Sequence, residues 1–174
     1  MELLATLRRS GGIDALARQA DLLPAAVGPA VEALLPALLD GIRSYAQHLG
    51  DGDQGVKAVL AMFGRLGDGN LAVEVMGPGP LSDEAGNRIL AHVFGSDEAK
   101  QRLANEVGAV SGNEPALLER LLPALAMLVC GYISARVRAD ETESESIAWL
   151  RELLVLPNPG EARPGFGLGS GTNG

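Results

Sequence analysis

The chain has 174 residues, of which 47% are hydrophobic but only 3% aromatic, and its formal net charge is −8. This suffices for one domain that buries roughly 70% of the surface of its unfolded chain, with a core of leucine, valine and alanine that favours helices. The negative charge argues against a nucleic-acid binder, because Lys and Arg neutralise the phosphates in such complexes, but an acidic face can still dock a basic partner.

The first 20 residues predict two short amphipathic helices, over 2–9 and 13–20, because their apolar residues recur at helical spacing. The segment Ser10-Gly11-Gly12 separates them. Residues 1–9 also lack the long apolar core and cleavage site of a signal peptide, so we expect a cytoplasmic protein.

A long apolar helix follows and runs as far as His48. Pro24 and Pro29 each suit a first helical turn, where the missing N–H costs nothing. At Pro36 we expect a kink or a break, because proline removes one backbone hydrogen bond and clashes with the preceding turn. Asp53 then stands where its carboxylate can cap the next helix.

Residues 70–76 alternate between apolar and polar side chains, as a strand does. A lone strand has no partner to pair with, so we expect a short helix or an extended connector instead. Gly77-Pro78-Gly79-Pro80 is a hard break that separates the two halves of the chain.

The second half carries clearer helix boundaries. Residues Ser82-Asp83-Glu84 begin one helix, which ends at Gly95, and Ser96 caps the next. Asn113-Glu114-Pro115 opens a long helix, and residues 140–145 form an acidic turn before a last helix near 145–156. The Gly/Pro-rich tail at 157–174 cannot offset its own ordering entropy, so we expect it to be disordered.

The longest nearly uninterrupted apolar run covers residues 121–133. It is apolar on every face and must therefore be buried on every face. As a helix it would be about 20 Å long. A bilayer needs ~20 apolar residues, and Glu119 and Arg120 precede the run, so a central core helix is favoured over a membrane span. Cys130 lies inside the run, which predicts a buried and unreactive thiol.

The pentapeptide Leu-Leu-Pro-Ala-Leu occurs twice, at 34–38 and at 121–125, which are 87 residues apart. Chance recurrence is one explanation in a chain so rich in Leu and Ala. An internal duplication is the other, with two related halves at 13–76 and 81–138. Two such units could bury their apolar faces against each other, which neither could do alone.

Three segments together resemble the YidB-like family, a bacterial domain of unknown function numbered nine-three-seven: Leu-Leu-Pro-Ala-Leu-Leu at 34–39, His-Val-Phe-Gly-Ser at 92–96 and Leu-Leu-Pro-Ala-Leu-Ala at 121–126. The resemblance covers about residues 13–137. It implies an all-helical bundle with one central helix surrounded by others, and it implies no catalytic residue. The insert at Gly77–Pro80 and the acidic tail depart from the family pattern.

His92 is the best single candidate for chemistry, and with Phe94 it forms a candidate ligand-binding pair. The simpler interpretation is a histidine at a helix C-terminus, where the helix dipole favours a positive charge. His48, Asp51 and Asp53 resemble metal ligands, but the segment lacks the remaining carboxylates of a calcium loop, so we predict no metal site.

We therefore predict a single all-α domain over residues 1–156, a bundle of about six to eight helices around a central apolar helix. We expect no catalytic residue, cofactor, nucleic-acid partner or membrane span. The function remains unknown; the favoured hypothesis is a helical interaction or assembly module that binds a protein partner or itself. The alternative is a small-ligand-binding protein or an enzyme with a pocket near His92. Docking to a membrane surface is disfavoured, because the inner leaflet is anionic.

Overall fold

The computed structural model describes residues 2–67 and 70–154, and every regular element within those ranges is an α-helix. The all-α class is thus confirmed, with nine helices in the described ranges where about six to eight were expected. In chain order they are α1 (Glu2–Arg9), α2 (Gly12–Ala20), α3 (Pro24–Leu49), α4 (Asp53–Leu66), α5 (Asn70–Met76), α6 (Glu84–Phe94), α7 (Asp97–Ser111), α8 (Pro115–Ala139) and α9 (Glu143–Leu153).

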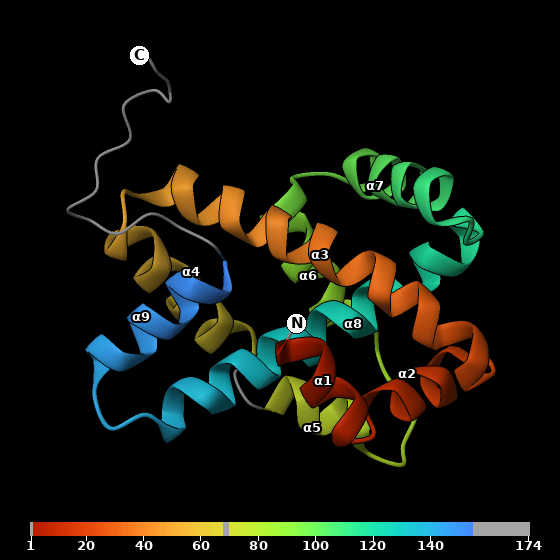
Figure 1. Ribbon diagram of the computed structural model, residues 1–174, viewed down its shortest axis with the longest axis horizontal. Coiled ribbons are helices and arrows are strands. Elements are labelled where there is room, and N and C mark those ends of the chain that lie inside the picture. Colours follow the sequence, from red (N-terminus) through yellow and green to blue (C-terminus); the bar gives the residue numbers. More distant parts are fainter. Residues whose placement is uncertain (1, 68–69, 155–174) are drawn as a thin grey trace.

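The core is built around α8, which packs against α2 to α7 and α9 (Figure 1). Every residue from Leu121 to Gly131 is buried, and so is Ile133, while Tyr132 is partly exposed. The apolar run therefore forms the central helix that its composition predicts, because a helix with no polar face can only be accommodated in the interior.

Two helices, α3 and α8, have the length and composition of membrane-crossing segments, with mean hydropathies of 1.5 and 1.7 in their most apolar windows. Within the fold, 72% of that window is buried in α8 and 44% in α3. The core helix of a soluble protein passes the same test, so these two helices do not establish a membrane span.

The prolines do not interrupt the long helices. α3 continues through Pro29 and Pro36. Of the kink or break expected at Pro36, the break is therefore wrong and the kink stays a prediction. Pro29 lies inside the helix instead of in its first turn. Pro24 does occupy the first turn, as predicted. A proline at position 36 leaves the carbonyl of Glu32 without its helical donor. Glu32 and Pro36 are both exposed, which lets water satisfy that carbonyl.

Two of the helix starts are capped by side chains. The Ser96 hydroxyl accepts a hydrogen bond of 3.1 Å from the backbone N–H of Ala99, as predicted. Thr142 and Glu145 form a capping box that begins α9, so part of the expected acidic turn is the first helical turn. Asp53 does not cap α4; its carboxylate instead forms an ion pair with Arg151 of α9.

Two glycines bring neighbouring helices almost to backbone contact with α8. A Cβ added at Gly86 of α6 would overlap the backbone carbonyl of Pro123, and one added at Gly131 of α8 would overlap the backbone of Ala72 in α5. Small residues at a crossing let two helices approach closely, so α5 and α6 are seated directly on the central helix.

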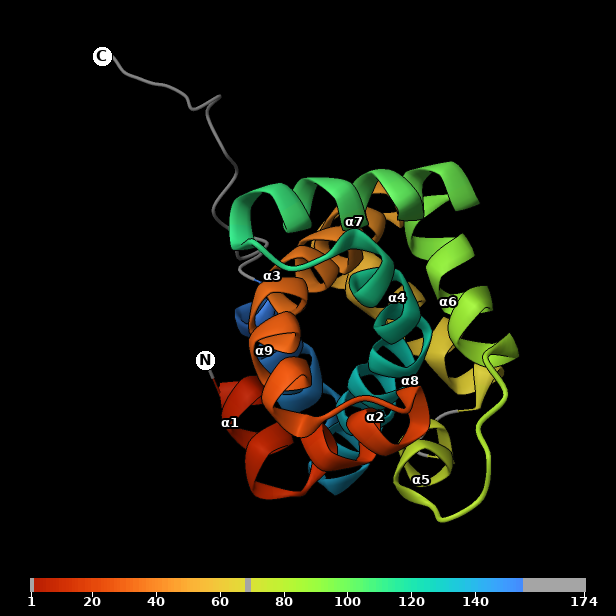
Figure 2. The ribbon, with the colours of Figure 1, turned by 90° about the vertical axis from the view of Figure 1, so that its right-hand side faces the viewer.

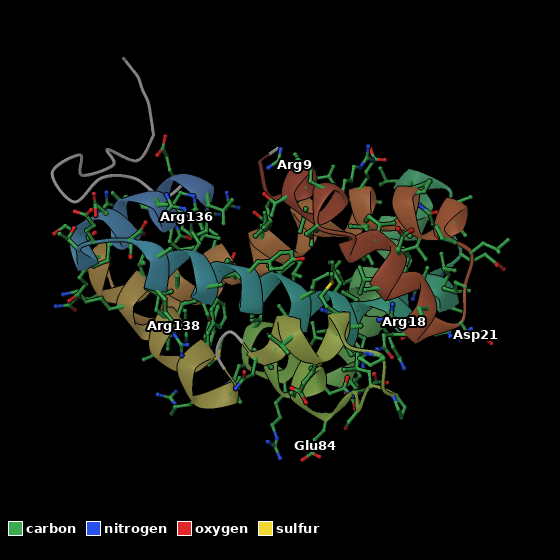
Figure 3. The ribbon with its side chains drawn as sticks, turned by 90° about the horizontal axis from the view of Figure 1, so that it is seen from below. Arg9, Arg18, Asp21, Glu84, Arg136 and Arg138 are labelled. Carbon is green, nitrogen blue, oxygen red and sulfur yellow. The ribbon has the colours of Figure 1, made fainter. Side chains whose placement is uncertain are left out.

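The Gly/Pro segment 77–80, which follows α5, is held by side chains at the end of α2. The Arg18 guanidinium donates to the carbonyl of Gly77 at 2.7 Å, and the Gln19 amide donates to the carbonyl of Gly79 at 3.1 Å. Figure 3 shows Arg18 at this end of α2, near Asp21. These contacts satisfy backbone carbonyls that have no helical partner beyond the end of α5.

The internal duplication stays a prediction. An offset of 87 residues would place α2 on α7, α3 on α8 and α4 on α9. The packing has a matching symmetry, since α2 contacts both α3 and α8, and α7 contacts both α8 and α3. The predicted disordered tail at 157–174 lies outside the described residues.

Candidate functional site

His92, the first sequence candidate, lies on the surface in the last turn of α6. Its ring centroid is 6.4 Å from that of Tyr45 in α3, with the two planes tilted by 57°. Across residues 2–67 and 70–154, no hydrogen bond or ion pair involves its imidazole. The histidine is thus presented to solvent beside one aromatic ring, with no carboxylate converging on it.

Phe94, the second candidate, packs against α3. A Cβ added at Gly41 would lie only 2.5 Å from Phe94 Cε1 and 2.6 Å from Cζ, so the glycine makes room for the ring. Residues two apart on a helix point in widely different directions. The structure therefore does not bring His92 and Phe94 together, and the role of either in ligand binding stays a prediction.

Phe94 instead lines a groove of about 850 Å³ between α3 and α7. Figure 2 shows α7 lying along one side of the bundle, next to α3 and α6. Two helices supply the walls and the end of α6 contributes at one end. The lining residues are Glu32, Ala33, Pro36, Ala37, Asp40, Gly41, Ser44, Val93, Phe94, Ala99, Arg102, Leu103, Glu106, Val107, Val110 and Ser111.

The groove is open because α7 is attached to the bundle by small residues. Only Ala104 and Gly108 of α7 are buried. Leu103 and Val107 are partly buried and Val110 is 90% exposed. Opposite them, α3 offers Ala33 and Ala37, whose methyl groups are too small to fill the space. Apolar surface of both helices therefore faces water inside the groove.

The charged residues of the groove are mostly acidic: Glu32 and Asp40 on α3 and Glu106 on α7, against the single base Arg102. Glu32 accepts a hydrogen bond of 2.5 Å from Arg8 across the surface, and Asp40 pairs with its helical neighbour Arg43. Within the described ranges, neither Arg102 nor Glu106 forms an ion pair. The groove thus combines an apolar lining with a negative balance of charge.

No metal centre is assembled by the part of the chain that the structure describes, where no group of three or more His, Cys, Asp or Glu side chains converges. Asp53, one of the weak candidates, is engaged with Arg151. Cys130 is completely buried, and burial raises the pKa of its thiol well above the usual range. A buried, protonated thiol is a poor nucleophile.

Cys130 should therefore resist alkylation by iodoacetamide in the folded protein and react once urea unfolds it.

The same burial of the Cys130 thiol predicts that stability depends on pH. Above about pH 8.5 an unfolded thiol ionises while the folded one stays protonated, so the unfolded state binds fewer protons and the free energy of unfolding falls as pH rises. Mass spectrometry checks the first effect, and urea melts at pH 7 and pH 10, with Cys130→Ala as control, check the second. Rapid alkylation under native conditions would contradict both.

Sequence reasoning missed the groove, because α3 and α7 are separated by α4 to α6 along the chain. One signal was present. Leu103, Val107 and Val110 lie four and three residues apart and so form one apolar stripe on α7. The bundle buries none of them fully, and apolar surface left exposed in this way indicates a surface with a use.

The comparisons with known proteins identify a family and nothing narrower. A family model described as "Bacterial protein of unknown function (DUF937)" matches residues 2–136. The comparisons with curated proteins and with solved structures gave no match. The family match covers α1 to α7 and nearly all of α8, including both walls of the groove.

Proposed function

We propose that this chain, which belongs to the DUF937 family of bacterial proteins of unknown function, is a non-catalytic cytoplasmic binding module. Its groove between α3 and α7 would hold a protein segment, either from a partner or from a second copy of the chain.

One observation carries the proposal: apolar side chains of two helices stay exposed to water around an open groove. Val110 is 90% exposed, and Leu103 and Val107 are only partly covered. Exposed apolar surface rimmed by polar residues marks sites of interaction. The groove's volume of about 850 Å³ is large enough for several side chains of a partner.

The contacts around the groove favour binding over catalysis. General acid–base chemistry needs titratable groups within hydrogen-bond reach of one substrate atom. Glu32 and Asp40 are already engaged with Arg8 and Arg43, and His92 does not line the groove. The alternative of an enzyme with a pocket near His92 therefore has less support than docking.

A photoreactive amino acid in place of Val110 should crosslink the occupant in living cells of the native host. This position tolerates a large side chain because Val110 is almost fully exposed. The expected result is one discrete product on a denaturing gel, whose mass distinguishes a second copy from a partner. The same residue in place of the exposed Glu152 on α9 should give no product.

His92→Ala, combined with the crosslinker at 110, should leave the product unchanged. Equal crosslinking from both positions, or none from either, would contradict docking in the groove. Loss of the product with His92→Ala, in a protein that still folds, would favour a site near the histidine.

A further inference from the structure

We infer that the occupant of the groove is an amphipathic α-helix whose apolar ridge is flanked by lysine or arginine. This inference rests on the proposed function and specifies the chemistry of its partner.

The shape of the groove suits a helix. Its walls, α3 and α7, cross each other: Figure 2 shows α7 lengthwise, whereas α3 runs largely into the depth of that view. Along α3 the lining extends from Glu32 to Ser44, which at ~1.5 Å per residue is about 18 Å. A helix of three to four turns has this length, and amphipathic helices commonly bind by laying an apolar ridge into such a groove.

The lining has complementary features for that ridge. Ala33 and Ala37 on α3 permit a close approach of a helical backbone, while Leu103 and Val107 on α7 offer apolar contact. Docking would cover these residues, and it would remove apolar surface from water, which is favourable.

The charges select a basic partner. Glu32 and Asp40 are eight residues apart on α3, which is two turns and about 80° further round the helix, and both line the groove. Both pair with arginines at the surface, where ion pairs are weak and a partner's cation can compete for the same carboxylates. Glu106 faces the groove from α7 without an ion pair of its own.

The charge of the whole chain acts in the same direction. With a formal net charge of −8, the protein attracts cationic partners over a distance and repels anionic ones. Nucleic acid and an anionic membrane surface are therefore poor occupants of this groove. The single base in the lining, Arg102, would donate hydrogen bonds to a carboxylate of the occupant and so help to set its direction.

The test uses the full chain and three fluorescein-labelled helical peptides of 14 residues. The first has a leucine ridge flanked by lysines, the second replaces the lysines with glutamates, and the third keeps the lysines but replaces the leucines with glutamines. Fluorescence anisotropy at 150 mM salt should show the first peptide binding at least tenfold more tightly than either of the others.

Two variants locate the binding. Ala37→Trp fills the groove and should abolish binding, while Glu106→Lys should weaken the leucine–lysine peptide about fivefold. Glu152→Lys makes the same charge change on α9, outside the groove, and should leave affinity unchanged. Circular dichroism melts confirm that each variant is folded; if Ala37→Trp fails to fold, Ala33→Trp replaces it.

Four other outcomes would overturn the inference of a basic helical occupant, and they can be told apart from a failure of docking in the groove. Equal binding of the lysine and glutamate peptides, lost in Ala37→Trp, would reject the basic partner but leave groove docking intact. A dimer in light scattering that Ala37→Trp converts to monomer would make a second copy the occupant. If the glutamine peptide bound as tightly as the leucine peptide, the interaction would be a nonspecific attraction between charges and would not involve an apolar ridge. Absence of any peptide binding, with the crosslink at Val110 still formed, would reject a helical occupant; absence of both would reject the function as well.

Discussion

Replacing Leu122 with alanine is expected to lower the free energy of unfolding by about 2–5 kcal/mol, the range typical of buried leucines. Leu122 is fully buried in α8, the helix on which most of the others pack. The loss has two parts: the transfer free energy of the removed carbons and the cavity that they leave. The cavity part should be large here, because helices surround α8 and cannot all move inward.

Leu35→Ala provides the matched comparison. Leu35 is also fully buried, but α3 borders the open groove on another side, so its surroundings can relax further into the space left. We expect a smaller loss within the same range, and less than about 0.5 kcal/mol for the exposed Val110→Ala. Urea melts measure all three, and a neutral Leu122→Ala would show that α8 is not the central helix of the folded protein.

Replacing Gly86 with alanine should destabilise the protein by about 1–3 kcal/mol, the usual cost of overpacking. The added methyl group would overlap the carbonyl of Pro123. That neighbour is backbone of the buried central helix, which cannot rotate away as a flexible side chain can. α6 would have to move off α8, and this outweighs the gain of ~1 kcal/mol in helix propensity from glycine to alanine.

Gly64→Ala is the control for this effect. Gly64 lies inside α4, is exposed, and has no atom within 4 Å of an added Cβ. Only the propensity gain remains, so this variant should be more stable by about 0.5–1 kcal/mol. Opposite signs for the two glycines in thermal melts are the expected result; equal effects would mean that the α6–α8 crossing is less close than the structure has it.

The sequence was informative wherever a local rule decides the structure. Glycine and proline marked most helix ends, and the run at 121–133 indicated a central helix because no other placement hides an all-apolar surface. Of the kink or break predicted at Pro36, the break was wrong because tertiary packing maintains α3 on both sides of the proline, while the carbonyl that lost its hydrogen bond faces solvent. The local sequence predicted that Asp53 caps α4. It gave no sign of the ion pair that Asp53 forms instead, because the partner Arg151 is distant in sequence.

The candidate site was the hardest part to predict. Phe94 was singled out through its short motif, yet what places it in the groove is the absence of a side chain at Gly41 on another helix. No periodicity in either helix indicates that α3 and α7 lie beside each other with small residues between them. Such a surface depends on the tertiary arrangement, which no local pattern encodes.

The position of α8 near the end of the described chain has a consequence for synthesis. About 90 residues separate the end of α3 from the end of α8, and a ribosome adding ~5–20 residues per second needs roughly 5–20 seconds to make them. Throughout this time the apolar faces of α2 and α3 have emerged without the helix that will cover them. Until residue 139 leaves the exit tunnel, aggregation of the nascent chain therefore competes with its folding.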